Sequence, residues 1–217
     1  MRDTAIKDTG PYTLGEEIGN AVSHGTMAVF VLGGIAPTTI HAYTRLGALA
    51  AVSVTVFMCS LFLMFLSSTL YHCMTQASRY KQVMQILDHS FIYVAIAGTY
   101  TPVALVVIGG WRGVVVTSLQ WVMVLFGILY KSLAKRRIPK ISLLIYLIMG
   151  WSVVLVAPTF FRNASLGLFL LILCGGLFYS AGVYFYAKKG RRYFHMIWHF
   201  FVNLGAVSHF MAVLLFM

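Results

Sequence analysis

The sequence predicts an all-α integral membrane protein, a bundle of seven transmembrane helices with a cytoplasmic N-terminus and an external C-terminus. Of its 217 residues, 60% are hydrophobic and only 10% are charged, whereas a soluble domain has about 25% charged residues. A soluble fold of this size could not hide so much apolar surface, but a lipid bilayer is a solvent for it. The lengths of the apolar stretches and the positions of the basic residues support the same fold.

Seven stretches are long and apolar enough to cross a bilayer, which takes about 20 residues in a helix. Pro102 and Pro158 fall inside two of them, and we expect kinks there rather than loops, because neighbouring helices can satisfy the disturbed backbone. Residues 16–217 are thus expected to form one transmembrane domain after a short cytoplasmic segment, residues 1–15. The stretches are Ile18–Ala42, Gly47–His72, Leu87–Ile108, Gly113–Leu133, Ile141–Phe161, Leu166–Ala187 and His195–Met217.

The basic residues predict the orientation of the bundle. Of the sixteen Lys and Arg residues, only Arg45, Arg112 and Arg162 fall on one side of a seven-span topology, and the other thirteen share the side of the N-terminus. Cytoplasmic loops carry the excess of basic residues in membrane proteins. This distribution accounts for the net charge of +11, so we expect membrane lipids rather than nucleic acid as partners. The expected location is the cell membrane. The sequence does not decide between a monomer and a homo-oligomer.

Ionisable side chains within the apolar stretches are the first candidates for function, because each costs about 2.5–3.5 kcal/mol to insert. The predicted topology brings six of them, from four helices, to the cytoplasmic end of the bundle. This agreement is informative because the loop charges that fixed the topology do not include these residues. The six are His24, His72, Asp88, His89, His195 and His199.

Three of the histidines have the pattern of a zinc site. His195 and His199 are four residues apart and therefore share one helical face, and His72 would complete a three-histidine set. Zinc with three protein ligands keeps a fourth position open for water, as in catalytic sites. We expect Asp88 to hydrogen-bond that water or to take its proton as a general base. Ser68, one turn before His72, would support the site or stabilise a developing oxyanion.

The other histidines have simpler interpretations. His24 and His89 are expected to be interfacial residues or to support the ligands rather than to bind metal. His209 follows His195 by fourteen residues, or about 21 Å along a helix. We therefore expect His209 to be buried and hydrogen-bonded deep in the bundle.

Several motifs resemble those of the progestin and adipoQ receptor superfamily, whose bacterial branch is the haemolysin III family. The likeness runs from about Glu16 to the end of the chain. The motifs are Ser68-Thr69-Leu70-Tyr71-His72, Asp88-His89 and His195-Met196-Ile197-Trp198-His199, with Glu16-Glu17-Ile18-Gly19-Asn20, Ser23-His24-Gly25, Ala97-Gly98-Thr99-Tyr100-Thr101-Pro102 and Met149-Gly150-Trp151.

The resemblance implies seven helices, a cytoplasmic N-terminus and zinc bound by His72, His195 and His199, with Asp88 reaching the ion through water. The superfamily is similar to alkaline ceramidases, which implies amide hydrolysis on a lipid. Bacterial members are named for haemolysis and have been linked to membrane-lipid and membrane-energy homeostasis.

Two functional hypotheses follow. The first is a zinc-dependent intramembrane hydrolase that acts on an amide or ester of a lipid. The second is a non-enzymatic protein, either a receptor-like sensor or a haemolysin-type cytolytic protein, in which zinc is structural. An ion-coupled transporter ranks last, because His209 alone stands near mid-membrane and a relay needs several such groups.

Overall fold

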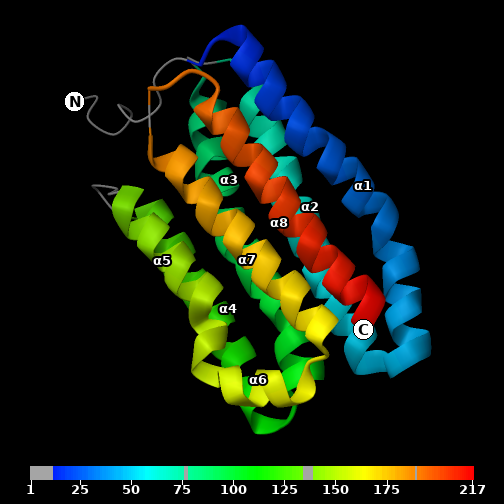
Figure 1. Ribbon diagram of the computed structural model, residues 1–217. Coiled ribbons are helices and arrows are strands. Elements are labelled where there is room, and N and C mark those ends of the chain that lie inside the picture. The colour runs from blue at the N-terminus through cyan, green and yellow to red at the C-terminus, as the bar shows by residue number, and fades with distance from the viewer. Residues whose placement is uncertain (1–11, 76–77, 134–138, 189) are drawn as a thin grey trace.

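The computed structural model describes residues 12–75, 78–133, 139–188 and 190–217, and within these ranges it is helical, with no strand. Seven helices are long and apolar enough to cross a membrane, which confirms the predicted fold class. The start of the first helix and the C-terminus lie at opposite ends of the bundle (Figure 1). The cytoplasmic N-terminus remains a prediction, and most of segment 1–15 and the basic residues at 135–137 lie outside the described ranges.

Five helices follow the predicted stretches to within a few residues at each end. The first, α1, extends about four residues beyond its stretch at each end. At its N-terminus, Thr13 and Glu16 form a capping box. The five helices are α1 (Leu14–Leu46), α2 (Ala48–Cys73), α4 (Gly110–Leu133), α7 (Leu166–Ala187) and α8 (Phe194–Phe216).

The third helix begins eight residues earlier than its apolar stretch. Helix α3 runs over Arg79–Pro102, and the Ser78 side chain caps it by accepting a hydrogen bond from Tyr80 N at 3.2 Å. Its first turns are polar, so hydrophobicity alone does not find them. Asp88 and His89 therefore do not begin the helix, as the sequence suggested, but lie more than two turns inside it.

Two prolines change the helix type without creating a loop. After Pro102 the backbone continues as a π-helix, Val103–Ile108. The fifth span is divided into α5 (Pro139–Trp151), a 3₁₀ segment (Ser152–Val156) and α6 (Ala157–Asn163), with Pro158 in the first turn of α6. A proline lacks the N–H that would continue an α-helix, and this explains why the fifth span is broken.

A tyrosine on α3 compensates for the break in the fifth span. The Tyr100 hydroxyl donates to Gly150 O at 2.7 Å and accepts from Val153 N at 2.9 Å. Backbone groups in a bilayer must find partners inside the protein. Tyr100 supplies such partners on both sides of the point where α5 ends.

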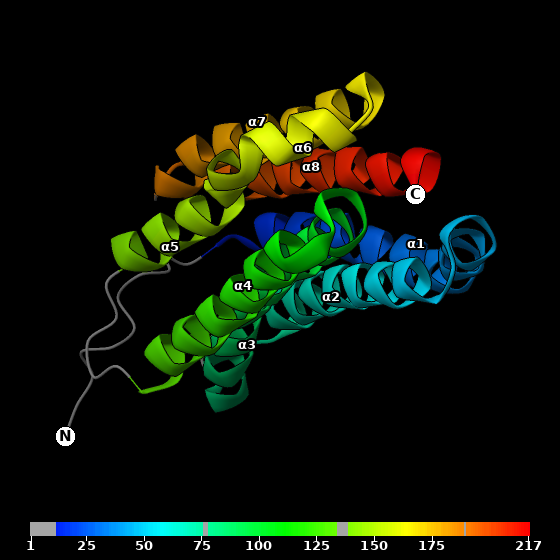
Figure 2. The same cartoon turned by 90° about the horizontal axis from the view of Figure 1, so that it is seen from below.

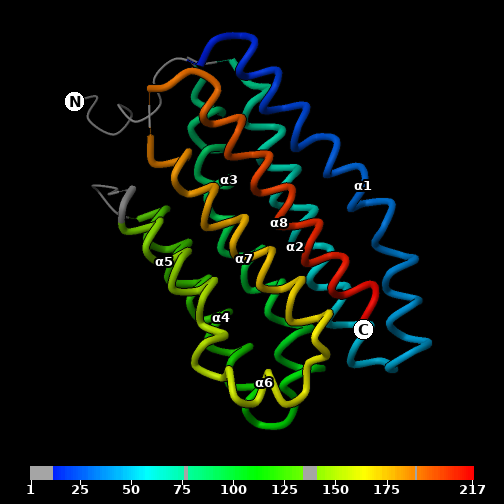
Figure 3. The backbone as a smooth tube through the Cα atoms, in the orientation of Figure 1, coloured from blue at the N-terminus to red at the C-terminus, as the bar shows by residue number. Residues whose placement is uncertain are grey.

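Helix α2 occupies the centre of the bundle, packed against α1 and α3, while α7 packs along α8. Figure 2 shows α7 and α8 side by side, opposite the layer that contains α2 and α3. Many large apolar side chains on the outer faces are exposed, including Phe30, Leu125 and Leu155. A soluble protein would bury much of this surface, whereas a bilayer solvates it. Helices α1, α3 and α8 begin at the end of the bundle where α2 ends (Figure 3), so the ionisable residues near these helix ends belong to the same end.

The contact between α2 and α3 depends on Gly98, because a Cβ atom there would overlap the Ser60 side chain. We predict that Gly98→Ala destabilises the protein by about 1–3 kcal/mol through overpacking. Gly33→Ala on α1 is the control, since nothing lies within 4 Å of its Cβ position. Thermal unfolding in detergent checks this, and equal melting temperatures for both variants would contradict the packing argument.

Candidate metal centre

The nitrogen atoms of three histidines converge between α2 and α8. His195 Nε2 lies 3.3 Å from His72 Nε2 and 3.2 Å from His199 Nε2. One nitrogen from each of the three rings lies within 4.8 Å of the other two, so the group could hold a metal ion. The structure thus brings together the three residues that sequence spacing selected.

The opposite ring nitrogens fix how two of these imidazoles are protonated. His72 Nδ1 lies 2.6 Å from Glu17 Oε2. His199 Nδ1 lies 3.1 Å from Ser23 Oγ and 3.3 Å from Asn20 O, and the Ser23 hydroxyl donates to Asn20 O at 2.9 Å. A carboxylate and a carbonyl oxygen only accept, and the Ser23 hydroxyl already donates its proton to Asn20 O. In the neutral rings, therefore, each Nδ1 carries the proton and each Nε2 the lone pair. Such outer contacts orient the ligands in metal sites.

This protonation pattern favours a cation at the centre of the triad. Two lone pairs, from His72 and His199, point at His195 Nε2, and a neutral imidazole has one N–H at most. A hydrogen bond could satisfy only one of the two contacts, whereas a metal ion accepts all three nitrogens. The donor set therefore fits a metal ion with imidazole ligands.

Glu17 connects the triad to the start of α3. Its second oxygen accepts a hydrogen bond from Lys81 Nζ at 2.5 Å, and the same ammonium donates to Met74 O at 3.0 Å. Our sequence analysis missed both Glu17 and Lys81 as site residues, because both precede the apolar stretches of their helices. A usable signal was the seven-residue spacing from Glu17 to His24, which puts the two on one helical face.

Aromatic rings cover the triad on two sides. The ring centroid of Tyr12 lies 5.0 Å from that of His195, and the Trp198 centroid lies 4.9 Å from it. Burial raises the pKa of the Tyr12 phenol, with smaller contributions from nearby tyrosine and acidic groups. Tyr12, which precedes α1, therefore adds an uncharged cover to the site.

Asp88, Ser68 and His24 form a second buried group beside the triad. The Ser68 hydroxyl is hydrogen-bonded to the Asp88 carboxylate, and Ser68 Oγ lies 2.8 Å from His24 Nδ1. The His24 ring stacks on His199, with centroids 3.6 Å apart and planes at 5°. The pair expected to perform catalysis is therefore adjacent to the possible ligands, and His24 supports both groups.

His89 lies apart from both groups. Its Nδ1 is 2.7 Å from Gln85 O in the preceding turn, and its Nε2 is 3.4 Å from the Tyr186 hydroxyl. Neighbouring residues differ by about 100° around a helix, so His89 points in a different direction from Asp88. His209 is buried deeper in the bundle, as expected, with Nε2 at 3.1 Å from Ile172 O.

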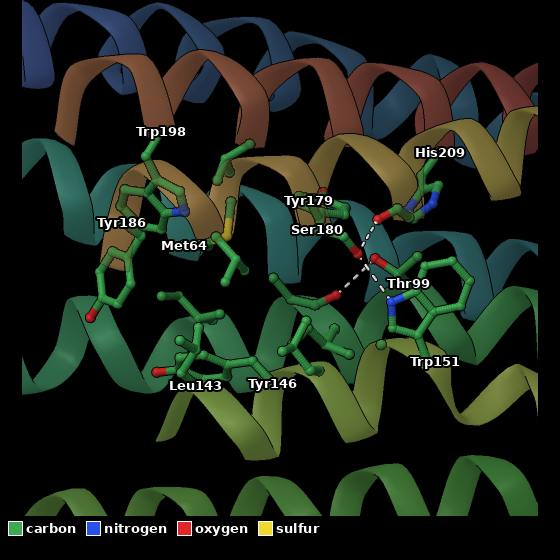
Figure 4. A pocket seen from close by; sticks show the side chains of 18 of the residues that line it. Met64, Thr99, Leu143, Tyr146, Trp151, Tyr179, Ser180, Tyr186, Trp198 and His209 are labelled. Atoms are coloured by element: carbon green, nitrogen blue, oxygen red, sulfur yellow. Dashed lines mark hydrogen bonds between the residues drawn. The ribbon is translucent and has the colours of Figure 1, made fainter. Parts of the chain in front are cut away.

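A cavity of about 140 Å³ begins at the second group and extends toward the middle of the bundle. Asp88, Ser68 and His24 line one end, and His209 and Tyr179 line the other. The walls between them are mostly apolar side chains from α3, α5, α7 and α8, some of which appear in Figure 4. The three triad histidines do not line it, so it meets the site on the side of Asp88.

The family model described as Haemolysin-III related matches residues 12–210 of the chain. The chain belongs to the haemolysin-III related family. This match includes all the residues of both buried groups and the cavity. The family assignment expected from the motifs is thereby confirmed.

Curated relatives support the same assignment. Hemolysin-3 of Bacillus cereus is 37% identical over 93% of this chain and 91% of that protein. The Hemolysin-3 homolog of Bacillus subtilis (strain 168) is 37% identical over 94% and 96%. Monocyte to macrophage differentiation factor of Homo sapiens is 30% identical over 69% and 64%, which supports the link to the wider receptor superfamily.

We predict that Glu17→Gln lowers metal affinity about 10–100-fold, the usual effect of losing a partner that orients a ligand. The substitution keeps the shape of the side chain but removes the charge between His72 and Lys81. Thr26→Val on the same helix is the control, because the exposed Thr26 hydroxyl bonds Val22 O within α1. Competition with a chromophoric chelator measures both, and equal affinities would show that Glu17 does not orient His72.

Proposed function

We propose that the protein is a zinc-dependent hydrolase that acts inside the membrane on an amide or ester bond of a lipid. The observation that carries this proposal is the position of the possible metal centre beside a buried carboxylate that faces an apolar cavity. A site that only stabilised the fold would need neither the carboxylate nor the cavity. Hydrolysis of a membrane lipid would in turn give the protein a role in lipid and energy homeostasis.

The spacing of the triad supports zinc as the metal. Two nitrogens bound tetrahedrally at about 2.0–2.1 Å from zinc lie about 3.3–3.4 Å from each other. The observed separations of 3.3 and 3.2 Å are close to this value. Three imidazoles are also the protein ligands of some catalytic zinc sites, in which a fourth position is left for water.

Zinc bound there would supply a Lewis acid that makes water a nucleophile near neutral pH. Asp88 would accept the proton of the attacking water and pass it to the leaving group. Ser68 holds the Asp88 carboxylate in place through its hydroxyl. The apolar walls would exclude bulk water from the reacting bond.

His24 supports a polar ligand at this end of the cavity. If Ser68 donates its only proton to Asp88, His24 Nδ1 must donate to Ser68, which leaves a lone pair on His24 Nε2. That nitrogen is buried and has no hydrogen-bond partner among the described residues. A lipid amide or hydroxyl group in the cavity would provide the missing donor.

We predict that Asp88→Asn retains stoichiometric zinc but lowers the hydrolysis of lipid amides or esters by at least about a hundredfold, because general-base catalysis contributes that much. His89→Gln is the matched control, since the His89 ring contacts Gln85 O and the Tyr186 hydroxyl rather than Ser68 or the triad. Metal analysis of the purified protein and product detection by mass spectrometry measure the two effects. Absence of bound metal, or turnover that survives chelation, would refute the proposed enzyme.

The names of the two Bacillus relatives favour a second candidate, a cytolytic protein. In that case, as in a receptor-like sensor, the metal would be structural and would connect α2 to α8. Because the outer faces are apolar, lipid should surround the helical bundle, and the protein should not open a pore.

We predict that liposomes containing the protein retain an entrapped dye. Leakage that persists in His199→Ala would instead support lysis without the metal centre.

A further inference from the structure

A pair of polar rings lies at the far end of the cavity, away from the metal centre. His209 on α8 and Tyr179 on α7 both line it, with ring centroids 5.5 Å apart. Figure 4 shows the two side chains near each other at one end of the cavity. Neither residue has a role in the proposed hydrolysis, so this end of the cavity needs its own explanation.

His209 lines the cavity and has an unused hydrogen-bond acceptor. Its Nε2 lies 3.1 Å from the backbone oxygen of Ile172, which can only accept, so Nε2 carries the proton and Nδ1 the lone pair. The residue is 8% exposed, and its buried Nδ1 has no hydrogen-bond partner within the part of the chain that the structure describes. Buried polar atoms are normally paired, so a ligand with a donor group would satisfy this nitrogen.

The packing of α7 on α8 fixes both rings in place. A Cβ atom at Gly175 on α7 would overlap the His209 ring, and one at Gly205 on α8 would lie 2.8 Å from the Tyr179 ring. Each helix thus has a glycine at the point where an aromatic ring of the other helix packs against it. Because this exchange leaves the His209 ring little room to turn, the ring stays at the wall of the cavity.

The neighbouring polar groups differ from His209 because they are already paired. Ser180 Oγ donates to Gly176 O at 2.8 Å and accepts from Trp151 Nε1 at 3.0 Å. Thr99 Oγ1 donates to Ala95 O at 2.8 Å. The unpaired acceptor at this depth is therefore specific to His209 among these residues.

The depth of His209 sets where along a lipid chain the donor would lie. His209 follows His199 by ten residues on α8, or about 15 Å. Half of the hydrocarbon core of a bilayer is also about 15 Å thick, which is roughly the reach of one acyl chain. A chain whose polar end lay at Asp88 would pass His209 in its distal half.

We propose that the cavity binds an acyl chain that carries a hydroxyl group in its distal half, and that His209 Nδ1 accepts a hydrogen bond from this hydroxyl. The placement of the polar end at Asp88 rests on the proposed function. The recognition of the hydroxyl does not, because it needs binding alone. His209 is then a residue that determines which lipid is preferred.

The test uses the purified full chain in detergent and measures how three fatty acids displace a fluorescent fatty acid. The probes are stearic acid, stearic acid with a mid-chain hydroxyl, and α-hydroxystearic acid, whose hydroxyl is next to the carboxyl group. We expect the mid-chain hydroxyl to strengthen binding about tenfold, as one hydrogen bond to a buried acceptor can. The α-hydroxyl should bring no such gain. Equal affinity for all three probes would overturn the proposal.

Variants test which residue makes the contact. His209→Phe keeps a ring but removes the acceptor, and should erase the preference for the mid-chain hydroxyl. Ser208→Ala is the control, because its exposed hydroxyl bonds Leu204 O in the same helix. If His209→Phe fails to fold, the probe series on the wild-type chain still decides.

The same measurements distinguish this proposal from the proposed hydrolase. Asp88→Asn should keep the preference for the mid-chain hydroxyl, since binding needs no turnover. A preference without hydrolysis of any lipid would sustain this inference and count against the enzyme. Hydrolysis without the preference would overturn this inference alone.

Discussion

The site depends on one buried carboxylate at the start of α1. Glu17 accepts from His72 at the end of α2 with one oxygen and from Lys81 at the start of α3 with the other. Removing a charge from water is costly unless it is paired and hydrogen-bonded, so the three helix ends must meet for this group to be stable. The same contact leaves the His72 lone pair directed at the other two imidazoles.

The sequence predicts depth in the membrane better than it predicts direction around a helix axis. Helices that span one bilayer have similar lengths. The topology predicted from the loop charges therefore put the four histidines at the same end of the bundle, which the structure confirms for His24, His72, His195 and His199. His89 has the same depth as its neighbour Asp88, but only packing decides which of the two faces the site. Glu17 and Lys81 were missed because an apolar stretch locates only the part of a helix that crosses the membrane. Both residues lie in polar turns that precede such a stretch, and these turns contribute side chains to the site.

The two buried groups divide the chemistry of the site between them. The histidine triad lies behind the wall of the cavity, and the group formed by Asp88, Ser68 and His24 lies on it. A ligand in the cavity would therefore meet the carboxylate and the hydroxyl before it met the metal ligands. The break in the fifth span belongs to this arrangement, because Tyr100 both supports the break and lines the cavity.

The start of α8 shows how backbone geometry aims the metal ligands. Tyr193 precedes the helix in the left-handed conformation, with φ 60°, which is costly for a residue other than glycine. Its N–H is held by Glu16 Oε1 at 2.7 Å. Because α8 is apolar around most of its circumference, contact with lipid leaves its azimuth almost undetermined. This strained turn, anchored by the first turn of α1, acts together with the packing on α7 to fix the rotation of α8 and hence the direction of both His195 and His199.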